Sequence, residues 1–385
     1  MDIDRIKRHV KIVCTLGPAS NTPDVLQKLL QSGMDIVRLN LSYGTLEEHH
    51  QLITMIRSMS REMGLATAIL LDLPGRKRRT GDIRAVFGDH IQFARTNQAD
   101  YLALSFITSA QQVVEVKSLL KEEGIDIPVI VKIEKGEALA TSGSIIDVGD
   151  GVMVARGDLG LQISIEKVPP AQKKIIREAN QRGRPVITAT EMLESMVKSA
   201  MPTRAEATDV ANAVLDGTDA VMLSEETSIG QYPVEAVTMM VKIILEAEAV
   251  FPHYGFLSSS QGESINEVDD AAARAACQIA YQIGAKAIIA LTAGGSTALR
   301  VAKHRPCQPI LAVTGSETVM RRLTLVWGVY PLKKSMPTNL EEWLEAARTT
   351  ALETGVAKPG DRIVVTAGLP LSVPGSTNLV KIHKL

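Results

Sequence analysis

The stretch PVIVKIEKGEALATSGSIIDVGDGVMVARGDLG, residues 128–160, decides the fold of this chain. It opens with the apolar run Pro128–Ile133, continues through a longer amphipathic segment, and returns to the apolar run Gly151–Ala155. Short apolar, β-branched runs joined by an amphipathic segment are typical of parallel strands with a crossover helix between them. We therefore expect a βαβ unit in this part of the chain.

The same alternation extends over the first 230 residues and predicts eight strands. Six further runs of this kind are Lys11–Leu16, Asp35–Leu41, Thr67–Leu73, Tyr101–Phe106, Pro185–Thr190 and Ala220–Ser224. Eight parallel strands with intervening helices close into a barrel. The expected fold class is therefore α/β, with a (β/α)8 TIM barrel.

A second, smaller α/β domain is expected after the barrel. The tract Phe251–Phe256 and the Ser-rich segment 257–262 follow the helical stretch Pro233–Val250, and we interpret them as a linker. Beyond it we expect strands over Ala287–Leu291, Pro309–Val313 and Arg362–Thr366. We expect helices over Asp269–Ile283 and Leu340–Glu353. We place the barrel at residues 1–255 and the C-terminal domain at residues 256–385.

Composition and charge argue against several classes of protein. The chain has 385 residues, with 42 Lys plus Arg against 43 Asp plus Glu, so no overall field favours nucleic acid or an anionic membrane. Its three cysteines are far apart, which predicts neither a disulfide framework nor a cysteine metal site. We find no apolar signal segment at the N-terminus and no apolar run of transmembrane length. These features predict a cytoplasmic protein.

Polar residues stand at the C-terminal ends of the predicted strands. They are Arg38, Asn40, Asp72, Ser105, Lys132, Glu134, Arg156, Asp158, Thr190, Ser224 and Glu226. In a (β/α)8 barrel these strand ends form one mouth, where active sites are built. Residues that are distant in sequence should therefore meet there.

Lys132 and Glu134 are the first candidates for chemistry, because alternate residues of a strand share a face. A cation and a carboxylate placed together can hold a phosphate and a metal; the alternative is a salt bridge at a strand edge. Asp158 follows a Gly-flanked turn after the next strand, and it could share one Mg²⁺ with Glu134. An Arg-Gly-Asp turn by itself is a weak signal.

Several motifs closely resemble signatures of the pyruvate kinase family. They are MVARGDLG at residues 153–160, VITAT at 186–190 with MLESM at 192–196, PTRAE at 202–206, and DVANAVLDGTDAVMLS at 209–224. The resemblance covers nearly the whole chain. It implies a glycolytic homotetramer that acts on phosphoenolpyruvate, pyruvate and ADP or ATP with Mg²⁺ or Mn²⁺.

The resemblance also implies roles for individual residues. Lys132 would neutralise the phosphoryl group in transfer, and Arg38 and Arg79 would contact phosphates. Glu134 and Asp158 would ligate the divalent metal. The amides of Gly157 and Asp158 and the hydroxyl of Thr190 would hold the substrate carboxylate, and Thr190 would also lie on the path of the proton to the enolate carbon.

Two departures from the family affect the expected activity. The family inserts a lid domain after the third strand, whereas only a short segment, Asp82–Gly88, precedes the next predicted helix here. Without a lid, water competes with phosphoryl transfer, so we expect weak ATP formation. Asn40, Ser42 and Asp72 match the family's K⁺ ligands, but Lys77 stands where its K⁺-dependent branch has Glu, so we expect Lys77 to replace K⁺.

Two alternative functions stay open at this point. An open site with an intact enolate half predicts a lyase or C–C bond-forming enzyme, such as an oxaloacetate decarboxylase or an aldolase. The Gly-rich turn within Ala290–Thr297 could bind an anion, which would suit a non-catalytic sensor of phosphoenolpyruvate or a sugar phosphate. Tyr43, Glu191 and Glu225 replace His, Gln and Gly of the family, and they indicate either altered specificity or drift.

Overall fold

The structure is a computed structural model that describes residues 3–75, 83–259, 267–335, 339–369 and 376–385. The chain divides into two compact units, one formed by Lys11–Ala247 and the other by Met1–Val10 together with Glu248–Leu385. The first ten residues thus group with the C-terminal unit. The domain boundary at residue 255 remains a prediction.

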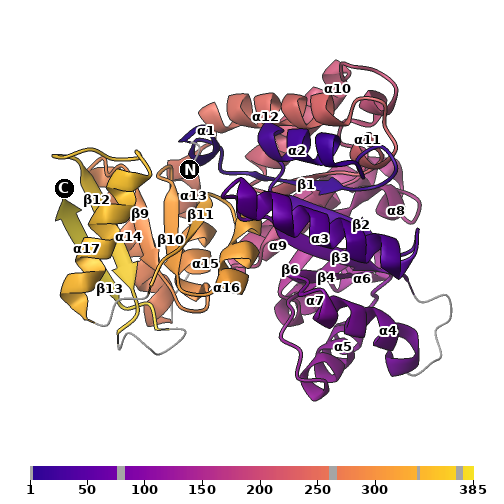
Figure 1. Ribbon diagram of the computed structural model, residues 1–385, viewed down its shortest axis with the longest axis horizontal. Helices are drawn as coiled ribbons and strands as arrows, with labels where there is room; N and C mark the ends of the chain where they lie inside the picture. The colour runs from indigo at the N-terminus through magenta and orange to yellow at the C-terminus, as the bar shows by residue number, and fades with distance from the viewer. Residues whose placement is uncertain (1–2, 76–82, 260–266, 336–338, 370–375) are drawn as a thin grey trace. The chain divides into compact units, whose positions relative to one another are not determined.

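The first unit is a closed barrel of eight parallel strands, in which β1 also pairs with β8 (Figure 1). The strands are β1 Lys11–Thr15, β2 Ile36–Asn40, β3 Ala68–Leu73, β4 Tyr101–Leu104, β5 Val129–Ile133, β6 Gly151–Ala155, β7 Val186–Ala189 and β8 Ala220–Leu223. This confirms the predicted fold class. The largest difference is at β4, which ends before Phe106 because that residue has a left-handed φ of 58°.

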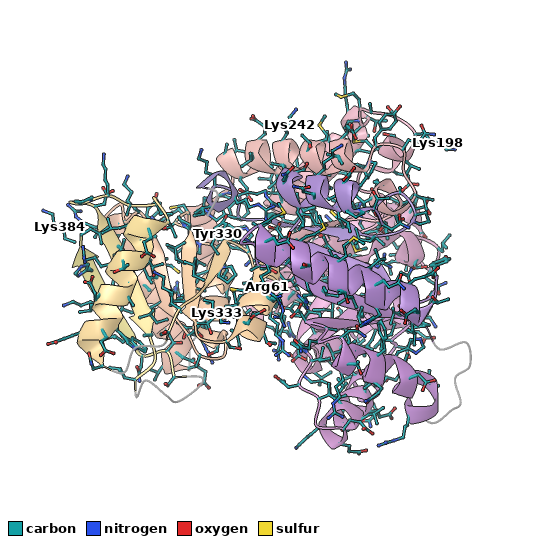
Figure 2. The ribbon with its side chains drawn as sticks, in the orientation of Figure 1. Arg61, Lys198, Lys242, Tyr330, Lys333 and Lys384 are labelled. Atoms are coloured by element: carbon teal, nitrogen blue, oxygen red, sulfur yellow. The ribbon has the colours of Figure 1, made fainter. Side chains whose placement is uncertain are left out.

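Helices follow each strand and cover the outside of the barrel (Figure 1). The longer ones are α2 Pro23–Ser32, α3 Leu46–Glu62, α4 Ile83–Thr96, α5 Ala110–Glu122, α7 Ser142–Val148, α9 Val168–Gln181, α10 Arg204–Leu215 and α12 Pro233–Ala249. Capping boxes start α3 at Thr45 and α10 at Thr203, and each satisfies free backbone N–H groups. Charged side chains such as Arg61, Lys198 and Lys242 are exposed on this outer surface (Figure 2).

Four aspartates fasten the N-terminal ends of the barrel strands. Each precedes an even-numbered strand and accepts a backbone N–H from the odd-numbered strand before it. The bonds run from Ile12 to Asp35, Ile69 to Asp100, Val129 to Asp150 and Val186 to Asp219, over 2.8–3.0 Å. This end of the barrel therefore serves stability, and the opposite end is left for chemistry.

The second unit contains a five-stranded sheet in the order β11-β10-β9-β12-β13. The strands are β9 Ile288–Leu291, β10 Ile310–Thr314, β11 Val329–Lys333, β12 Arg362–Ala367 and β13 Leu379–Lys384, and β13 alone runs antiparallel to its neighbour. The sequence reasoning missed β11 and β13. Both lie at sheet edges, and β11 contains Pro331, which such a strand tolerates but which weakens its signal in the sequence.

Alternate strand residues of this sheet serve two cores. Ile288, Ala290 and Val364 pack with helices α14 Val268–Gln282 and α15 Ser296–Lys303 on one face. Ile289, Leu311 and Val365 pack with Trp343 of helix α17 Leu340–Glu353 on the other. The unit therefore has three layers, and it confirms the prediction of a smaller C-terminal α/β domain.

The segment interpreted as a linker is partly helical, which corrects that expectation. Helix α13 covers His253–Ser259. The rings of Phe251 and Phe256 stack at 4.9 Å, and Leu257 is buried. These apolar contacts give the segment enough buried surface to hold a helix despite its Ser-rich end. Among the described helices, none has both the length and the apolar character that a bilayer span requires.

Candidate active site

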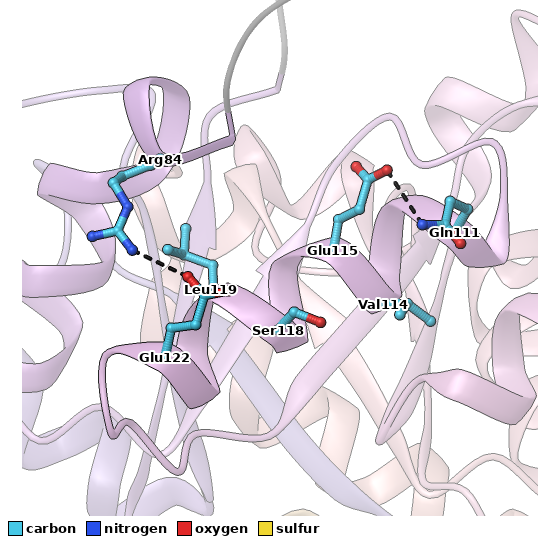
Figure 3. A pocket seen from close by; sticks show the side chains of 7 residues that line it. All are labelled: Arg84, Gln111, Val114, Glu115, Ser118, Leu119 and Glu122. Atoms are coloured by element: carbon cyan, nitrogen blue, oxygen red, sulfur yellow. Dashed lines mark hydrogen bonds and ion pairs between the residues drawn. The ribbon is translucent and has the colours of Figure 1, made fainter.

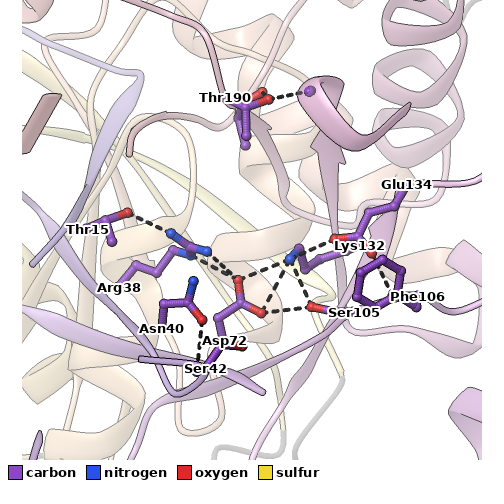
Figure 4. Close-up of polar contacts among 12 residues, drawn as sticks. Thr15, Arg38, Asn40, Ser42, Asp72, Ser105, Phe106, Lys132, Glu134 and Thr190 are labelled. Atoms are coloured by element: carbon purple, nitrogen blue, oxygen red, sulfur yellow. Dashed lines mark hydrogen bonds and ion pairs between the residues drawn. The ribbon is translucent and has the colours of Figure 1, made fainter. Parts of the chain in front are cut away.

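The C-terminal ends of strands β2 to β5 bring five polar side chains together, as Figure 4 shows. Arg38 comes from β2, Asp72 from β3 and Lys132 from β5, while Ser105 and Glu134 directly follow β4 and β5. All except Ser105 are buried. The predicted convergence of strand ends therefore holds for this part of the barrel mouth.

Lys132 is the central cation of this cluster. Its Nζ lies 2.7 Å from Oε1 of Glu134 and 3.2 Å from Oδ2 of Asp72, and it donates to Oγ of Ser105 at 2.9 Å. Burial alone would lower the pKa of Lys132, but the two carboxylates outweigh it and raise the pKa. The ammonium therefore stays charged at neutral pH.

Asp72 lies between two cations. Arg38 donates to Oδ2 of Asp72 from Nε at 3.0 Å and from Nη2 at 2.7 Å, and Ser105 donates to Oδ1 at 3.1 Å. The third nitrogen of Arg38, Nη1, donates to Thr15 Oγ1 at 2.9 Å. Burial acts to raise the pKa of Asp72, yet the charges of Arg38 and Lys132 lower it. The carboxylate is thus ionised and fully compensated.

Glu134 is the first of the two predicted metal ligands. Its Oε2 accepts the backbone N–H of Phe106 at 2.6 Å, and its Oε1 faces Lys132. The pKa of Glu134 is raised by burial first, and the nearby charge of Asp158 adds to the increase. Glu134 is therefore buried beside one cation, Lys132, and within the electrostatic influence of one carboxylate, Asp158.

The donor set suits Mg²⁺ or Mn²⁺. Both ions prefer a few carboxylate oxygens and complete their shell with substrate and water. Within the described ranges, no group of three or more His, Cys, Asp or Glu side chains is arranged to hold a metal. The two carboxylates predicted from the sequence are Glu134, which is buried, and Asp158, which is exposed.

Thr190 and Gly157 meet across the ends of β7 and β6. The amide of Gly157 donates to Thr190 Oγ1 at 2.8 Å, and this hydroxyl donates to the carbonyl of Ala189 at 2.6 Å. Asp158 follows in the one-turn helix α8, Arg156–Gly160. The structure thus brings together the three residues that were predicted to hold a substrate carboxylate, with the Gly157 amide already engaged by Thr190.

Of the three residues predicted to bind a monovalent cation, Asn40 and Ser42 contact each other, whereas Asp72 has other partners. Asn40 is the register partner of Asp72, and its Oδ1 accepts the amide of Ser42 at 3.1 Å. Asp72 is instead bound to Arg38 and Lys132. Two further predicted residues, Arg79 and Lys77, lie outside the described residues.

Some residues of the site were given no role from the sequence. Ser105 accepts a hydrogen bond from Lys132, and Thr15 accepts one from Arg38. Phe106 donates its backbone N–H to Glu134. Ser105 was noted at a strand end, which was the available signal. No side-chain pattern could have revealed the amide of Phe106.

A shallow pocket elsewhere on the barrel unit does not belong to this site. It lies where α4 meets α5, on the outside of the barrel, as Figure 3 shows. Its lining consists of Arg84, Gln111, Val114, Glu115, Ser118, Leu119 and Glu122. The pair of Arg84 with Glu122 is exposed, so solvent can compete for this surface.

Comparison with known proteins identifies the family of both units. The model of the pyruvate kinase barrel domain matches residues 7–90 and 87–237, and the model of the pyruvate kinase alpha/beta domain matches residues 270–383. A pyruvate kinase of Geobacillus stearothermophilus is 37% identical, with 98% of this chain and 80% of that protein covered. Pyruvate kinases of Sporosarcina psychrophila and Staphylococcus aureus are each 35% identical over the same shares. This chain belongs to the pyruvate kinase family.

Proposed function

We propose that this protein transfers the phosphoryl group of phosphoenolpyruvate to ADP and so forms pyruvate and ATP. The observation that carries the proposal is the position of Lys132, a buried cation 2.7 Å from Glu134 at the barrel mouth. An anionic phosphoryl group needs a fixed positive charge in a dry site. The pyruvate kinase relatives support the same substrates.

Each side chain has a defined task in this proposal. Lys132 and Arg38 neutralise the phosphoryl group as it leaves the enolate oxygen. The backbone N–H of Asp158 and the hydroxyl of Thr190 orient the carboxylate of the substrate, and Thr190 passes a proton to the enolate carbon, which completes the methyl group of pyruvate. Positioning and fixed charge thus supply most of the catalysis.

Glu134 and Asp158 are the residues that would hold Mg²⁺ or Mn²⁺. When bound, such an ion supplies positive charge against the negative charge that develops on the substrate oxygens. Phe106 keeps Glu134 in place through its amide. The position of both carboxylates after neighbouring strands, β5 and β6, supports this assignment.

We propose further that the enzyme works without the family's lid domain and is therefore slow. Between β3 and β4 the chain has only residues 74–100, and α4 occupies Ile83–Thr96 of them. The barrel model matches in two segments that meet at residues 87–90 in this connection. The match with the Geobacillus protein also extends over 472 positions, more than the 385 residues of this chain. An uncovered mouth admits water, which competes with ADP.

The monovalent cation of the family is dispensable in this proposal. The carboxylate of Asp72, one of the three expected K⁺ ligands, is already neutralised by Arg38 and Lys132.

A homotetramer in the cytoplasm is the assembly that we expect from the family, and light scattering on the purified protein would measure its oligomeric state.

The test incubates the purified protein with Mg²⁺ and phosphoenolpyruvate, with and without ADP, and follows pyruvate by NMR. Pyruvate that depends on ADP, with an equal amount of ATP, supports the proposal. Lys132→Met should lower this rate by about 100-fold or more, because a fixed charge on the transferring group is removed. Arg177→Lys, a change on helix α9, serves as the control. Release of pyruvate from oxaloacetate without any ADP-dependent turnover would reject phosphoryl transfer.

A further inference from the structure

Two consecutive residues after β7 have an unusual backbone. Thr190 has φ 66° and Glu191 has φ 53°, both in the left-handed region. A β-branched residue such as threonine avoids this region, because its side chain crowds the backbone there. Such strain persists only where neighbouring groups enforce it.

The side chain of Arg156 binds the carbonyl groups of this turn. Its Nη2 donates to the carbonyl of Thr190 at 2.6 Å, and its Nε donates to the carbonyls of Ala189 and Thr190, each at 3.2 Å. Arg156 is buried at the end of β6, next to Gly157. One guanidinium thus binds two consecutive carbonyl groups, those of Ala189 and Thr190, at the start of the strained turn.

Arg156 is itself held from the other side. Its Nη1 donates to Asp209 Oδ2 at 2.5 Å and to Gln172 Oε1 at 3.3 Å. Asp209 lies on α10 and Gln172 on α9, so helices outside the barrel fix the guanidinium. The charge pair matters most, because a buried cation needs a carboxylate partner.

The Thr190 hydroxyl is oriented by the same arrangement. It accepts the Gly157 amide at 2.8 Å, and Gly157 follows Arg156 in the chain (Figure 4). The Thr190 hydroxyl also lies close to the Cα of Gly157. A Cβ built on Gly157 would be 3.5 Å from Thr190 Oγ1. Arg156 therefore binds the main chain of Thr190, while the Gly157 amide and the carbonyl of Ala189 bind its hydroxyl.

We propose that Arg156 and Asp209 are positioning residues that hold Thr190 in its left-handed conformation and so aim its hydroxyl at the substrate. The inference rests on the proposed function, in which Thr190 passes a proton to the enolate carbon. In that step the O–H bond of Thr190 breaks as a C–H bond forms at the enolate carbon, the enolate C–O bond becomes the C=O bond of pyruvate, and water returns a proton to the Thr190 oxygen. Loss of either residue should lower the rate of this proton transfer, and it should change the affinity for the substrate much less.

The barrel contains a matched control for this arrangement. At its opposite end, Arg57 donates to the carbonyl of Gln98, which also has a left-handed φ of 49°, and to that of Thr67. It too is paired with an aspartate, Asp100, at 2.7 Å. Arg57 therefore performs the same structural task far from the mouth, where it should affect stability alone.

The experiment follows the exchange of the methyl protons of pyruvate for deuterium in D₂O with Mg²⁺, by proton NMR. Arg156→Lys keeps the charge but loses the planar fork, and should slow the exchange by up to about 100-fold, as small displacements of catalytic groups do. The KM for phosphoenolpyruvate should change by less than about 3-fold. Arg57→Lys should lower the melting temperature and leave the exchange unchanged.

A double-mutant cycle separates positioning from a general structural effect. In a Thr190→Ala background, Arg156→Lys should add little further loss, because the group that it positions is already gone. Asp209→Ala is the second variant, in case Arg156→Lys does not fold. Full and additive losses from Arg156 and Thr190 would overturn the proposal.

Crystal structures of the two variants test the inference without any activity. We expect the φ of Thr190 to leave the left-handed region once Arg156 or Asp209 is changed. If Thr190 keeps a φ near 66° in both variants, the inference fails, whatever the enzyme does. If the wild type exchanges no protons and forms no pyruvate, the proposed function fails instead, and the φ of Thr190 still decides the inference.

Discussion

Nη2 of Arg38 lies 2.7 Å from Oδ2 of Asp72, although the two residues are 34 positions apart in the sequence. They come from the neighbouring strands β2 and β3, and both are buried. Lys132 shares the same carboxylate from β5. One carboxylate therefore holds together the two cations that the proposed function assigns to phosphate.

Asp72→Asn should destabilise the barrel by about 3–5 kcal/mol, because removal of one partner leaves buried charges without compensation. Urea unfolding at pH 7, followed by circular dichroism, measures the loss. Asp89→Asn, on the outer helix α4, is the control and should change the stability by less than about 0.5 kcal/mol. A loss as small as the control's would contradict the role given to Asp72.

The same variant predicts a pH dependence. The pKa of Asp72 is lowered on folding from its ordinary value of 3.8, since the two cations outweigh its burial. Its contribution to stability is therefore present above pH 3.8 and is lost as the pH falls toward the folded-state pKa. The difference in free energy of unfolding between wild type and Asp72→Asn should shrink from pH 7 to pH 3. A constant difference would count against the predicted shift.

Replacement of K⁺ by Na⁺ or tetramethylammonium should leave the ADP-dependent rate within about 2-fold. The physical reason is that Arg38 and Lys132 already supply the charge beside Asp72. The rate is measured at constant ionic strength, because salt itself screens charged substrates. Activation by K⁺ alone of about 10-fold or more would show that Asn40, Ser42 and Asp72 still bind it.

Gly75→Ala should raise the Mg²⁺ concentration needed for half-maximal pyruvate formation by about 10-fold. A Cβ at this position would lie 1.9 Å from the ring of Phe106, so the ring must move, and with it the amide that binds Glu134. The strained φ of Phe106 leaves that amide little tolerance. The Mg²⁺ concentration for half-maximal pyruvate formation measures the effect.

Gly88→Ala is the matched control for this prediction. Gly88 lies within α4, where the nearest atom to a new Cβ is a side-chain carbon at 3.9 Å. Alanine should be neutral or slightly stabilising there, because glycine weakens a helix. Equal behaviour of the two variants toward Mg²⁺ would refute the coupling of Gly75 to Glu134.

His253 predicts that the C-terminal unit loses stability in acid. Burial lowers the pKa of His253 from 6.5, and the nearby His9 lowers it further, against Glu248 and the carbonyl of Arg305. The unfolded chain therefore takes up a proton before the folded one does, so stability falls as the pH drops from 6.5 through the folded-state pKa. His253→Gln should lose less stability between pH 7.5 and pH 5.

Tryptophan fluorescence measures this prediction selectively. The chain has two tryptophans, and both Trp327 and Trp343 are buried in the C-terminal unit. Trp327 also stacks on His9 at 4.4 Å and lies 5.8 Å from His253. An identical pH dependence of urea unfolding in wild type and variant would exclude His253 as its source.

Much of the barrel was predictable from the sequence. All eight barrel strands were predicted within two residues, because each is an apolar run buried on both faces. The sequence does not predict strands β11 and β13, and it predicts a linker where helix α13 lies, since edge strands and short helices depend on contacts that leave little local pattern.

The sequence by itself determined the order of strands and helices, and it placed Lys132, Glu134 and Thr190 at strand ends, because strand and helix periods are local properties of the chain. Only the tertiary structure decided which of these groups touch. The sharing of Asp72 by Arg38 and Lys132, the Phe106 amide on Glu134 and the grip of Arg156 on Thr190 all join different strands. Closure of the barrel sets these distances, and no spacing along one chain encodes them.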